Sequence, residues 1–269
     1  MATLKPRHLI TLTTDFGLNS PYVAQMKAAI YAVASEVTLV DITHGISPQN
    51  ILEGAIVLQD TCRYFPAGTV HVAVVDPGVG TQRPLIAAQL GEHYFVGPDN
   101  GLLSLWAEEV PPQQIVVLDR PQFWRSQVSR TFHGRDIMAP VAAHLAQGVP
   151  LLELGTPSTT WTRLPWPQPR WQSDRVQGEV VLVDHFGNLL TNIREADLTA
   201  RGLTAVSGWL DGRFALRLVR TYGDAEPGTL VGLFSSQGRF VVAVVCGSAA
   251  AQCGVGRGAT VVLHTVTRP

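Results

Sequence analysis

Short apolar runs and helix-like patterns alternate through the first half of the chain. Runs rich in Val, Ile, Leu and Thr predict strands, and two closely spaced runs at 85–90 and 93–97 predict a hairpin. The single strands are expected at residues 8–13, 37–42, 69–75 and 115–118.

Helical patterns separate these strands. Apolar positions at helical spacing predict helices over 22–34, 50–65 and 136–147. Ser20-Pro21 and Ser47-Pro48 are typical helix starts, because proline suits the first turn behind a serine cap. The alternation predicts an α/β fold class, with an N-terminal three-layer α/β/α domain over residues 1–155.

The second half has a different pattern. Residues 156–175 contain four prolines and three tryptophans without useful periodicity, which predicts a linker that lies against a domain surface. From 176 to 269 only strand-like runs follow, separated by Gly, Asp and Ser turns. That spacing predicts a C-terminal antiparallel β-barrel-like domain or a sandwich.

Composition and charge narrow the possible partners. A formal charge of −1, without a Lys or Arg run, argues against nucleic acid and membrane surfaces and favours a small-molecule substrate. The apolar run at the N-terminus ends too early for a signal peptide or membrane span. Three cysteines without paired spacing argue against disulfides, and no histidine spacing indicates a metal site. We therefore expect a soluble cytoplasmic protein without bound metal.

Two aspartates follow predicted strands. Asp76 opens the glycine-rich loop DPGVGTQR, and Asp15 stands in TTDFG after the first strand. Either could be a turn residue, since Asp, Pro and Gly favour turns. The carboxyl ends of strands in an open α/β sheet are also where ligands bind, and a carboxylate there could bind ribose hydroxyls or a cation. The loop lacks GK[ST] and GxGxxG spacing, which argues against phosphate binding.

FHGRDIMAP places His133 and Asp136 at the start of a predicted helix. Asp136 is interpreted as an N-terminal cap or first-turn acid. His133 lies outside the helix beside Gly134, where its imidazole serves either a structural hydrogen bond or a ligand.

The second half offers one polar turn, DHFGNLLTNI. Asp184, Phe186 and Asn188 belong either to a hairpin with Gly187 at positive φ, or to a surface that stacks a base and contacts its edge or sugar. FSSQGRF and CGSAA could be tight turns or could offer backbone groups to a ligand.

Taken in order, these segments resemble the S-adenosylmethionine (SAM) hydroxide adenosyltransferase family, which is related to SAM-dependent fluorinating and chlorinating enzymes. The resemblance covers nearly the whole chain. It rests on TTDFG, YVAQMKA, DITHGISPQNILEGA, FPAGTVHVAVVDPGVGTQR, YFVGPDNGLLS, FHGRDIMAPVAAHLA, DHFGNLLTNI and CGSAA.

The resemblance implies hydrolysis of SAM to adenosine and L-methionine, with an oxygen nucleophile attacking ribose C5′ and no cofactor. It implies a catalytic set of Asp76, Arg83 and His133, in which the aspartate holds the nucleophilic water, while the base stays open between His133 and a hydroxide held by Arg83. It also implies a homotrimer with the substrate at a subunit interface. The implied substrate-binding residues are Asp15, Asp184, Phe186, Asn188, Ser236 and Ala249.

Two alternatives remain. A halogenase on the same scaffold is disfavoured because Asp76 would repel a halide. The second alternative is a sensor that binds SAM or adenosine without turnover. Two positions depart from the family pattern: Ser248 replaces an expected asparagine, and Gln237 stands where the halogenating relatives carry an arginine that would meet the methionine carboxylate.

Overall fold

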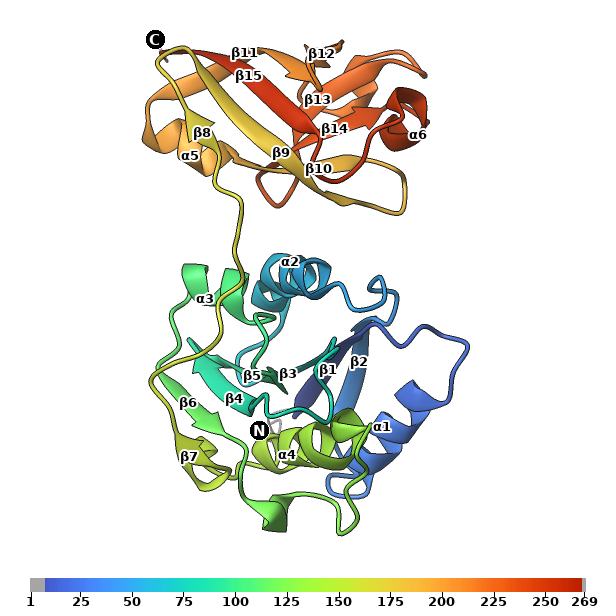
Figure 1. The fold of residues 1–269 in the computed structure, drawn as a ribbon, viewed down its shortest axis with the longest axis vertical. Coiled ribbons are helices and arrows are strands. Elements are labelled where there is room, and N and C mark those ends of the chain that lie inside the picture. The colour runs from blue at the N-terminus through green and yellow to red at the C-terminus, as the bar shows by residue number, and fades with distance from the viewer. Residues whose placement is uncertain (1–7, 268–269) are drawn as a thin grey trace, which may run out of the picture. The chain divides into compact units, whose positions relative to one another are not determined.

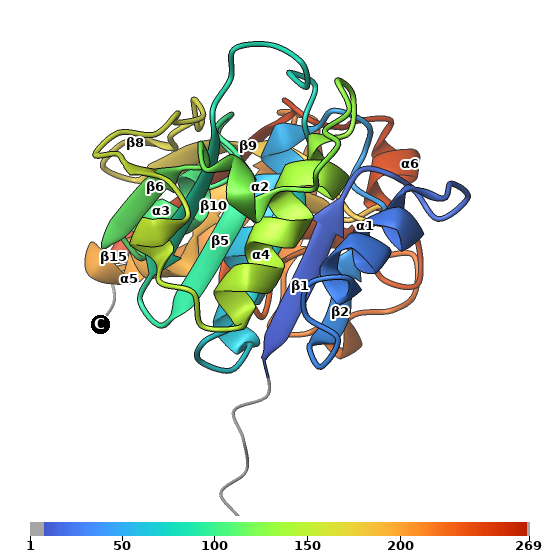
Figure 2. The ribbon, with the colours of Figure 1, turned by 90° about the horizontal axis from the view of Figure 1, so that it is seen from below.

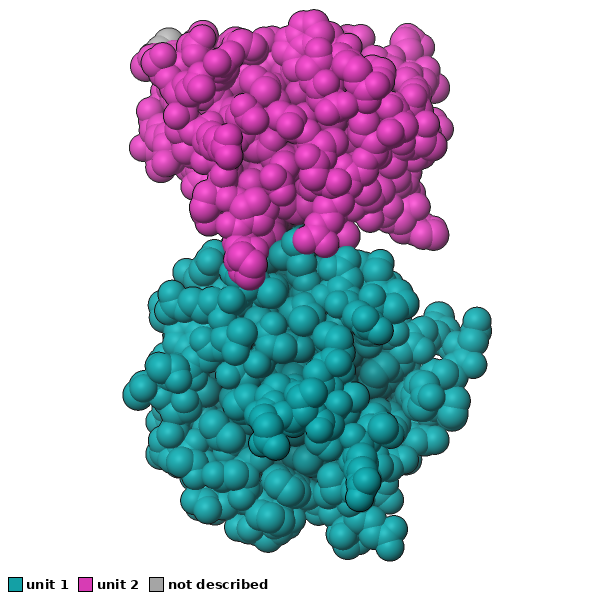
Figure 3. Space-filling model, in the orientation of Figure 1, with its two compact units in different colours: residues 1–164 teal, residues 165–269 magenta. Residues whose placement is uncertain are grey.

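The computed structural model describes residues 8–267, which divide into two compact units. Unit 1 runs to Leu164 and unit 2 begins at Pro165 (Figure 1, Figure 3). The division falls inside the proline-rich segment 156–175, whose two ends each join a sheet. Strand β7 (Thr156–Pro157) pairs with β6 (Gln114–Val117) in unit 1, and β8 (Arg170–Trp171) pairs with β9 (Arg175–Val183) in unit 2.

Unit 1 is built on a seven-stranded sheet in the order β2-β1-β3-β5-β4-β6-β7. The first four strands in this order run parallel, whereas β4, β6 and β7 pair antiparallel. The predicted hairpin is confirmed as β4 and β5. Besides β7, the strands of this sheet are β1 (Leu9–Thr14), β2 (Thr38–Thr43), β3 (Val70–Val74), β4 (Leu85–Leu90), β5 (His93–Pro98) and β6 (Gln114–Val117).

Helices cover both faces of this sheet, which confirms the three-layer prediction (Figure 1, Figure 2). One apolar core joins the sheet to α1 (Tyr22–Tyr31) and α4 (Ala139–Ala146). A second core joins its other face to α2 (Ile51–Thr61) and α3 (Ser104–Glu109). Burial of these faces from water is the main stabilising contribution to such a unit.

The helices begin close to the predicted positions, but neither predicted serine cap is formed. Ser20 does not cap α1, because its hydroxyl donates to the carbonyl oxygen of Phe16 and Pro21 precedes the first helical residue. Helix α2 begins at Ile51, and its cap is Asn50, which accepts a hydrogen bond from the Glu53 amide. Ser-Pro pairs favour tight turns as well as helix starts, so the pattern alone does not separate the two.

The helix expected over 136–147 begins with a π-helical turn, Gly134–Met138, before α4. Asp136 lies in the first turn of this helical segment, as one of the two interpretations predicted, and it is fully buried; the other interpretation, an N-terminal cap, was wrong because His133 holds that position. Its carboxylate accepts hydrogen bonds from Arg125, Arg135 and the Ser129 amide. Burial raises the pKa of this carboxyl group, but the bonds from Arg135 and Ser129 outweigh that effect and lower it to about 2.

Unit 2 is the predicted barrel. Strands β10, β14, β13, β12, β11, β15 and β9 follow one another, and the pairing of β10 with β9 closes the ring. All these pairings are antiparallel except β12 with β13, which is parallel. The strands are β9 (Arg175–Val183), β10 (Leu189–Arg194), β11 (Leu203–Leu210), β12 (Phe214–Leu218), β13 (Leu230–Phe234), β14 (Arg239–Val244) and β15 (Thr260–Thr267).

Two short helices in unit 2, α5 (Glu195–Ala200) and α6 (Ala249–Cys253), were not predicted. The tryptophans of the proline-rich segment are packed, as predicted. Trp161 lies against the second core of unit 1, whereas Trp171 packs on the core of unit 2 beneath Arg201. Within residues 8–267, no helix has the length and apolar character needed to cross a membrane.

Candidate active site

The loop after β3 returns Arg83 to the aspartate that opens it. The turn 76–80 is fixed by a hydrogen bond from the Val79 amide to the Asp76 carbonyl, and Gly80 takes a positive φ of 81° that glycine adopts without strain. The Thr81 hydroxyl donates to the Gly78 carbonyl at 2.7 Å. The chain therefore reverses, and the guanidinium of Arg83 comes to lie against the Asp76 carboxylate.

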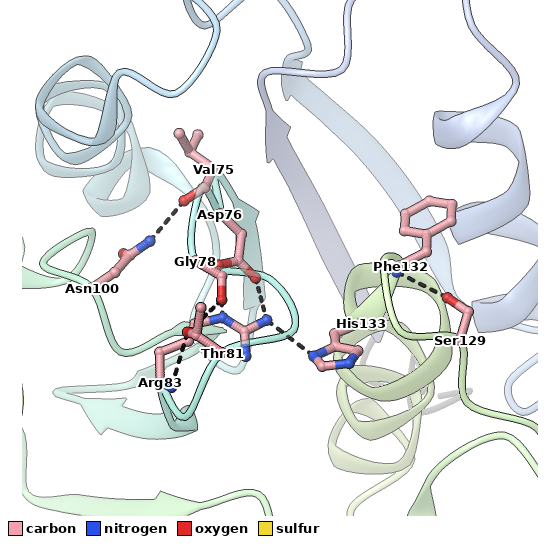
Figure 4. A network of polar contacts seen from close by, with 9 residues as sticks. All are labelled: Val75, Asp76, Gly78, Thr81, Arg83, Asn100, Ser129, Phe132 and His133. Atoms are coloured by element: carbon pink, nitrogen blue, oxygen red, sulfur yellow. Dashed lines mark hydrogen bonds and ion pairs between the residues drawn. The ribbon is translucent and has the colours of Figure 1, made fainter.

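Arg83 contacts both of the other residues implied to be catalytic, Asp76 and His133 (Figure 4). Its Nε donates to Asp76 Oδ1 at 2.7 Å and its Nη2 to Asp76 Oδ2 at 2.5 Å. The same Nη2 lies 3.0 Å from His133 Nδ1. The side chains of Asp76 and Arg83 are only 6% and 10% exposed, so water screens this ion pair weakly. Charge-assisted bonds of this bidentate kind fix geometry strongly.

The contact with Arg83 defines the protonation state of His133. A guanidinium has no acceptor, so Nδ1 of the imidazole must accept and the ring proton resides on Nε2. Burial lowers the pKa of His133 below its ordinary 6.5, and the Arg83 cation lowers it further, against the opposing effect of Asp76 and Asp136. His133 is therefore neutral at pH 7 and presents an Nε2–H donor.

Asp15 lies on the same cavity as Asp76 and His133. It follows β1, which pairs in parallel with β3, so both aspartates stand at the carboxyl ends of neighbouring strands as predicted. Asp15 Oδ2 accepts a hydrogen bond from the Gln49 amide at 2.8 Å. Its Oδ1 has no hydrogen-bond partner among residues 8–267, and it remains available to a ligand.

Sequence reasoning missed Gln49 and the aromatic wall of this cavity. Gln49 adopts a φ of 65°, which is unusual for a residue with a side chain, and lies between β2 and α2. Phe16 and Phe132 also line the cavity, with ring centroids 5.6 Å apart. Gln49 follows a proline in a predicted helix start, so no sequence signal marked it.

The remaining candidate residues belong to unit 2. Asp184, Phe186 and Asn188 lie in the β9–β10 turn, and Gly187 has the expected positive φ of 80°. Asp184 Oδ1 accepts bonds from the amides of Phe186 and Asn188, and Oδ2 accepts from the Asn188 side chain. The carboxylate therefore holds the turn, and the Phe186 side chain is 73% exposed.

Ser236 lines a cavity of unit 2 together with Asp184. Ala249 does not, since its side chain is completely buried in the core below α6. Ser248, which departs from the family pattern, caps α6 by accepting from the Ala251 amide at 3.1 Å. Serine and asparagine are about equally good caps, so this substitution preserves the helix start.

No group of three or more His, Cys, Asp or Glu side chains in the described range is placed to hold a metal ion. In unit 1, Asp76 and His133 line one cavity, and the Arg83 guanidinium bridges their side chains. Such a set can hold and orient an oxygen nucleophile near a cationic substrate.

Comparison with known proteins identifies the family. A sequence model of the SAM hydroxide adenosyltransferase N-terminal domain matches residues 10–155, and one of the C-terminal domain matches 178–262. A protein from Salinispora tropica named (R)-S-adenosyl-L-methionine hydrolase is 40% identical over 94% of this chain and 96% of its own. A fluorinase from Nocardia brasiliensis is 31% identical over 88% and 90%.

The fold agrees with these matches. The crystal structure of an uncharacterized conserved protein from Thermotoga maritima superposes with a TM-score of 0.88 at 35% identity, covering 94% of this chain and 99% of that one. Both halves of the chain match the same family in order, and the relatives are covered almost end to end. The chain therefore belongs to the SAM hydroxide adenosyltransferase family.

Proposed function

We propose that this protein is an enzyme that hydrolyses SAM to adenosine and L-methionine. The observation that carries the proposal is the placement of the Arg83 guanidinium between Asp76 and His133, beside a cavity that Asp15 also lines. The higher identity to a relative named as a SAM hydrolase than to one named as a fluorinase supports the same reaction.

The reaction is a nucleophilic substitution at ribose C5′. Water gives one proton to the solvent, and its oxygen forms the new bond to C5′. The bond from C5′ to sulfur breaks, and its electron pair leaves with the sulfur of methionine. The substrate is a sulfonium cation, so an anionic nucleophile and the cation neutralise each other in the transition state. Water is the only co-reactant, and no cofactor is required.

Arg83 is assigned to hold the nucleophile. The Nε and Nη2 atoms of Arg83 donate to Asp76, and Nη2 also contacts His133. Nη1 has no hydrogen-bond partner among the described residues. Free water has a pKa of about 15.7, and a neighbouring cation stabilises hydroxide. Asp76 orients Arg83, and the Nε2–H of His133 donates to the same oxygen. Nδ1 of His133 accepts from Arg83 and Nε2 carries the ring proton, so neither nitrogen is free to act as the base. We therefore assign a hydroxide held by Arg83 as the nucleophile.

Substrate contacts are divided between the two units. Asp15 Oδ1 would bind the ribose hydroxyls, as the family resemblance implies. The residues that we propose to bind the adenosine and methionine portions are Asp184, Phe186, Asn188, Ser236 and Ala249. Asp184 also holds its own turn, and Ala249 would act only through its backbone because its side chain is buried.

We also propose an assembly and a location. The proposed domains are residues 1–155 and 176–269 with a linker at 156–175, and the working form is a cytoplasmic homotrimer whose site lies between subunits. Three free cysteines, two of them buried, suit a reducing compartment. Sedimentation equilibrium should give three times the chain mass. A fragment ending at Thr156 that binds SAM as tightly as the full chain would contradict the shared site.

Product analysis tests the proposed reaction. Purified protein is incubated with SAM, with and without chloride or fluoride, and products are separated by chromatography. Equal amounts of adenosine and methionine, unaffected by halide, are expected. The ion pair with Arg83 neutralises Asp76, so repulsion of a halide by Asp76 is weaker than the sequence suggested. A 5′-halo-adenosine would indicate a halogenase, and SAM retained without products would indicate a sensor.

A further inference from the structure

A polar network joins β2 to the residue that precedes Asp15. His44 follows β2, and it is only 3% exposed. Its Nδ1 lies 2.9 Å from the hydroxyl of Thr14, the last residue of β1, and its Nε2 lies 3.1 Å from Asp41 Oδ1. Asp41 Oδ2 in turn pairs with Lys27 Nζ at 2.6 Å, at the partly exposed end of the network.

The ends of this network set the direction of its hydrogen bonds. Burial raises the pKa of Asp41, but the contacts with Lys27 and His44 outweigh that effect and lower it, so Asp41 is an ionised carboxylate. A carboxylate only accepts, and Nε2 of His44 therefore carries the ring proton. In the neutral imidazole Nδ1 is then an acceptor for the Thr14 hydroxyl. The Thr14 oxygen accepts in turn from the Phe16 amide at 3.2 Å.

The network reaches the backbone on both sides of Asp15. Thr14 and Phe16 are its neighbours in the chain, and the Thr14 side chain connects both of them to His44. The segment after His44 supplies the Gln49 amide, which donates to Asp15 Oδ2 at 2.8 Å. Because one carboxylate oxygen and the adjoining backbone are held, the remaining Oδ1 has a defined direction, on which the strength of a hydrogen bond depends.

We propose that Thr14, His44 and Asp41 are positioning residues, which hold Asp15 Oδ1 in the direction needed to accept hydrogen bonds from the ribose hydroxyls of the substrate. The inference rests on the proposed function, in which Asp15 binds the ribose. None of the three lines the cavity of Asp15, so they act through Asp15 and do not touch the substrate. Without the Thr14 hydroxyl, the buried Nδ1 of His44 loses its partner, which is costly enough to shift the turn.

The test compares two nucleosides that differ only in the ribose hydroxyls, adenosine and 2′,3′-dideoxyadenosine. Isothermal titration calorimetry gives their dissociation constants for the full-length protein. The wild type should bind adenosine about tenfold more tightly, because dideoxyadenosine lacks the hydrogen bonds to a charged oxygen. Thr14→Val keeps the shape of the side chain and removes its hydroxyl. This variant should prefer adenosine by about threefold or less, with its affinity for dideoxyadenosine unchanged within about twofold.

Two further substitutions in β1 are the controls. Thr14→Ser keeps the hydroxyl and should retain the preference for adenosine. Thr13→Val makes the same substitution one position earlier, where the buried Thr13 hydroxyl has no hydrogen-bond partner among the described residues, and both dissociation constants should stay unchanged. A role confined to the stability of β1 would lower the unfolding temperature of Thr14→Val and leave its preference for adenosine intact.

Asp41→Ala tests the distant end of the network. The Asp41 side chain is 39% exposed, so its removal should be compatible with folding. Without this carboxylate the ring proton of His44 can move to Nδ1, which then no longer accepts from Thr14, and the preference for adenosine should fall by about twofold or more. Lys27→Met removes the other partner of Asp41 and should retain the preference. If Thr14→Val does not fold, Asp41→Ala decides the proposal alone.

An unchanged preference in Thr14→Val or in Asp41→Ala would overturn the proposal, and so would a wild type that binds the two nucleosides equally. Adenosine release from SAM tests the proposed hydrolysis separately. A protein that shows the expected preferences but releases no adenosine would support the positioning residues and contradict the hydrolysis. Release of adenosine together with equal binding of the two nucleosides would do the reverse.

Discussion

At the scale of single residues, Arg83 organises the candidate site of unit 1. It binds both oxygens of Asp76 and contacts His133, and all three are remote in sequence from Asp15 on the same cavity. Removing one partner of a nearly buried ion pair leaves the other charge uncompensated, so Asp76 and Arg83 depend on each other structurally as well as chemically. Arg83 can hold an anion only while Asp76 keeps it in place.

The pH dependence of turnover distinguishes the two possible bases. Burial and Arg83 lower the pKa of His133 below its ordinary value of 6.5, so the neutral imidazole predominates above that pH. A histidine base would therefore give a rate that levels off above about pH 6.5. If the nucleophile is a hydroxide held by Arg83, the rate at saturating substrate should continue to rise through pH 7 and 8, by about tenfold per pH unit. Steady-state kcat in buffers of constant ionic strength measures this.

The control is His133→Gln, which keeps a hydrogen-bond acceptor and donor but cannot titrate. With hydroxide as nucleophile, this variant loses activity but keeps the alkaline rise. If the wild-type profile is flat above pH 6.5 and the variant loses its pH dependence, His133 is the base and our assignment is wrong.

At the scale of elements, the sequence was sufficient wherever a pattern has a single structural meaning. Asp15 and Asp76 follow apolar strand runs, and parallel pairing of those strands brings them to one edge of the sheet. The ambiguous signals gave errors. A Ser-Pro pair suits a turn as well as a helix start, and Asp136 near a helix start suits a cap as well as a buried ion pair.

Other features depend on tertiary contacts that no local pattern encodes. Gln49 has a positive φ, and its own amide donates a hydrogen bond to Asp15, 34 positions away in sequence. The bond from Arg83 to His133 joins residues 50 positions apart. The π-helical turn at Gly134–Met138 surrounds a carboxylate bound by Arg125 and Ser129 from the preceding loop.

The β9–β10 turn should be sensitive to a single methyl group. Gly187 has a φ of 80°, and a Cβ there would overlap the Ser248 hydroxyl that caps α6. Positive φ costs a residue with a side chain about 1–2 kcal/mol, and the overlap adds to it. We expect Gly187→Ala to lower the free energy of unfolding by about 2–4 kcal/mol, measured by urea denaturation of unit 2.

Gly212 provides the comparison. Its φ of 64° is also positive, but a Cβ there would meet no atom within 4 Å. Gly212→Ala should therefore cost only the backbone strain of about 1–2 kcal/mol. Equal destabilisation by the two substitutions would show that Ser248 does not constrain the turn.

At the scale of the whole molecule, acid stability should depend on a buried histidine of unit 1. His71 is fully buried, with Nδ1 2.8 Å from the Thr11 hydroxyl, and burial together with His93 lowers its pKa to about 3. The unfolded chain binds a proton near pH 6.5 and the folded chain only near 3. Stability from this group is complete above pH 6.5 and falls by about 1.4 kcal/mol per pH unit below it.

Urea unfolding of the full chain between pH 7 and 4.5 measures this effect. Carboxylates also titrate in this range, so the informative quantity is the difference between wild type and His71→Asn. The variant should be less stable at pH 7 but lose less stability as the pH falls. Parallel curves for the two proteins would show that His71 remains neutral in both states or is protonated in both.

The central claim is that water attacks C5′ of SAM at a site organised by Asp76 and Arg83. The most direct test is turnover in ¹⁸O-water with mass spectrometry of both products, for wild type and Asp76→Ala. We predict one ¹⁸O atom at the 5′ oxygen of adenosine, none in methionine, and loss of this product in the variant. Adenosine without label, or equal labelled product from Asp76→Ala, would contradict the account.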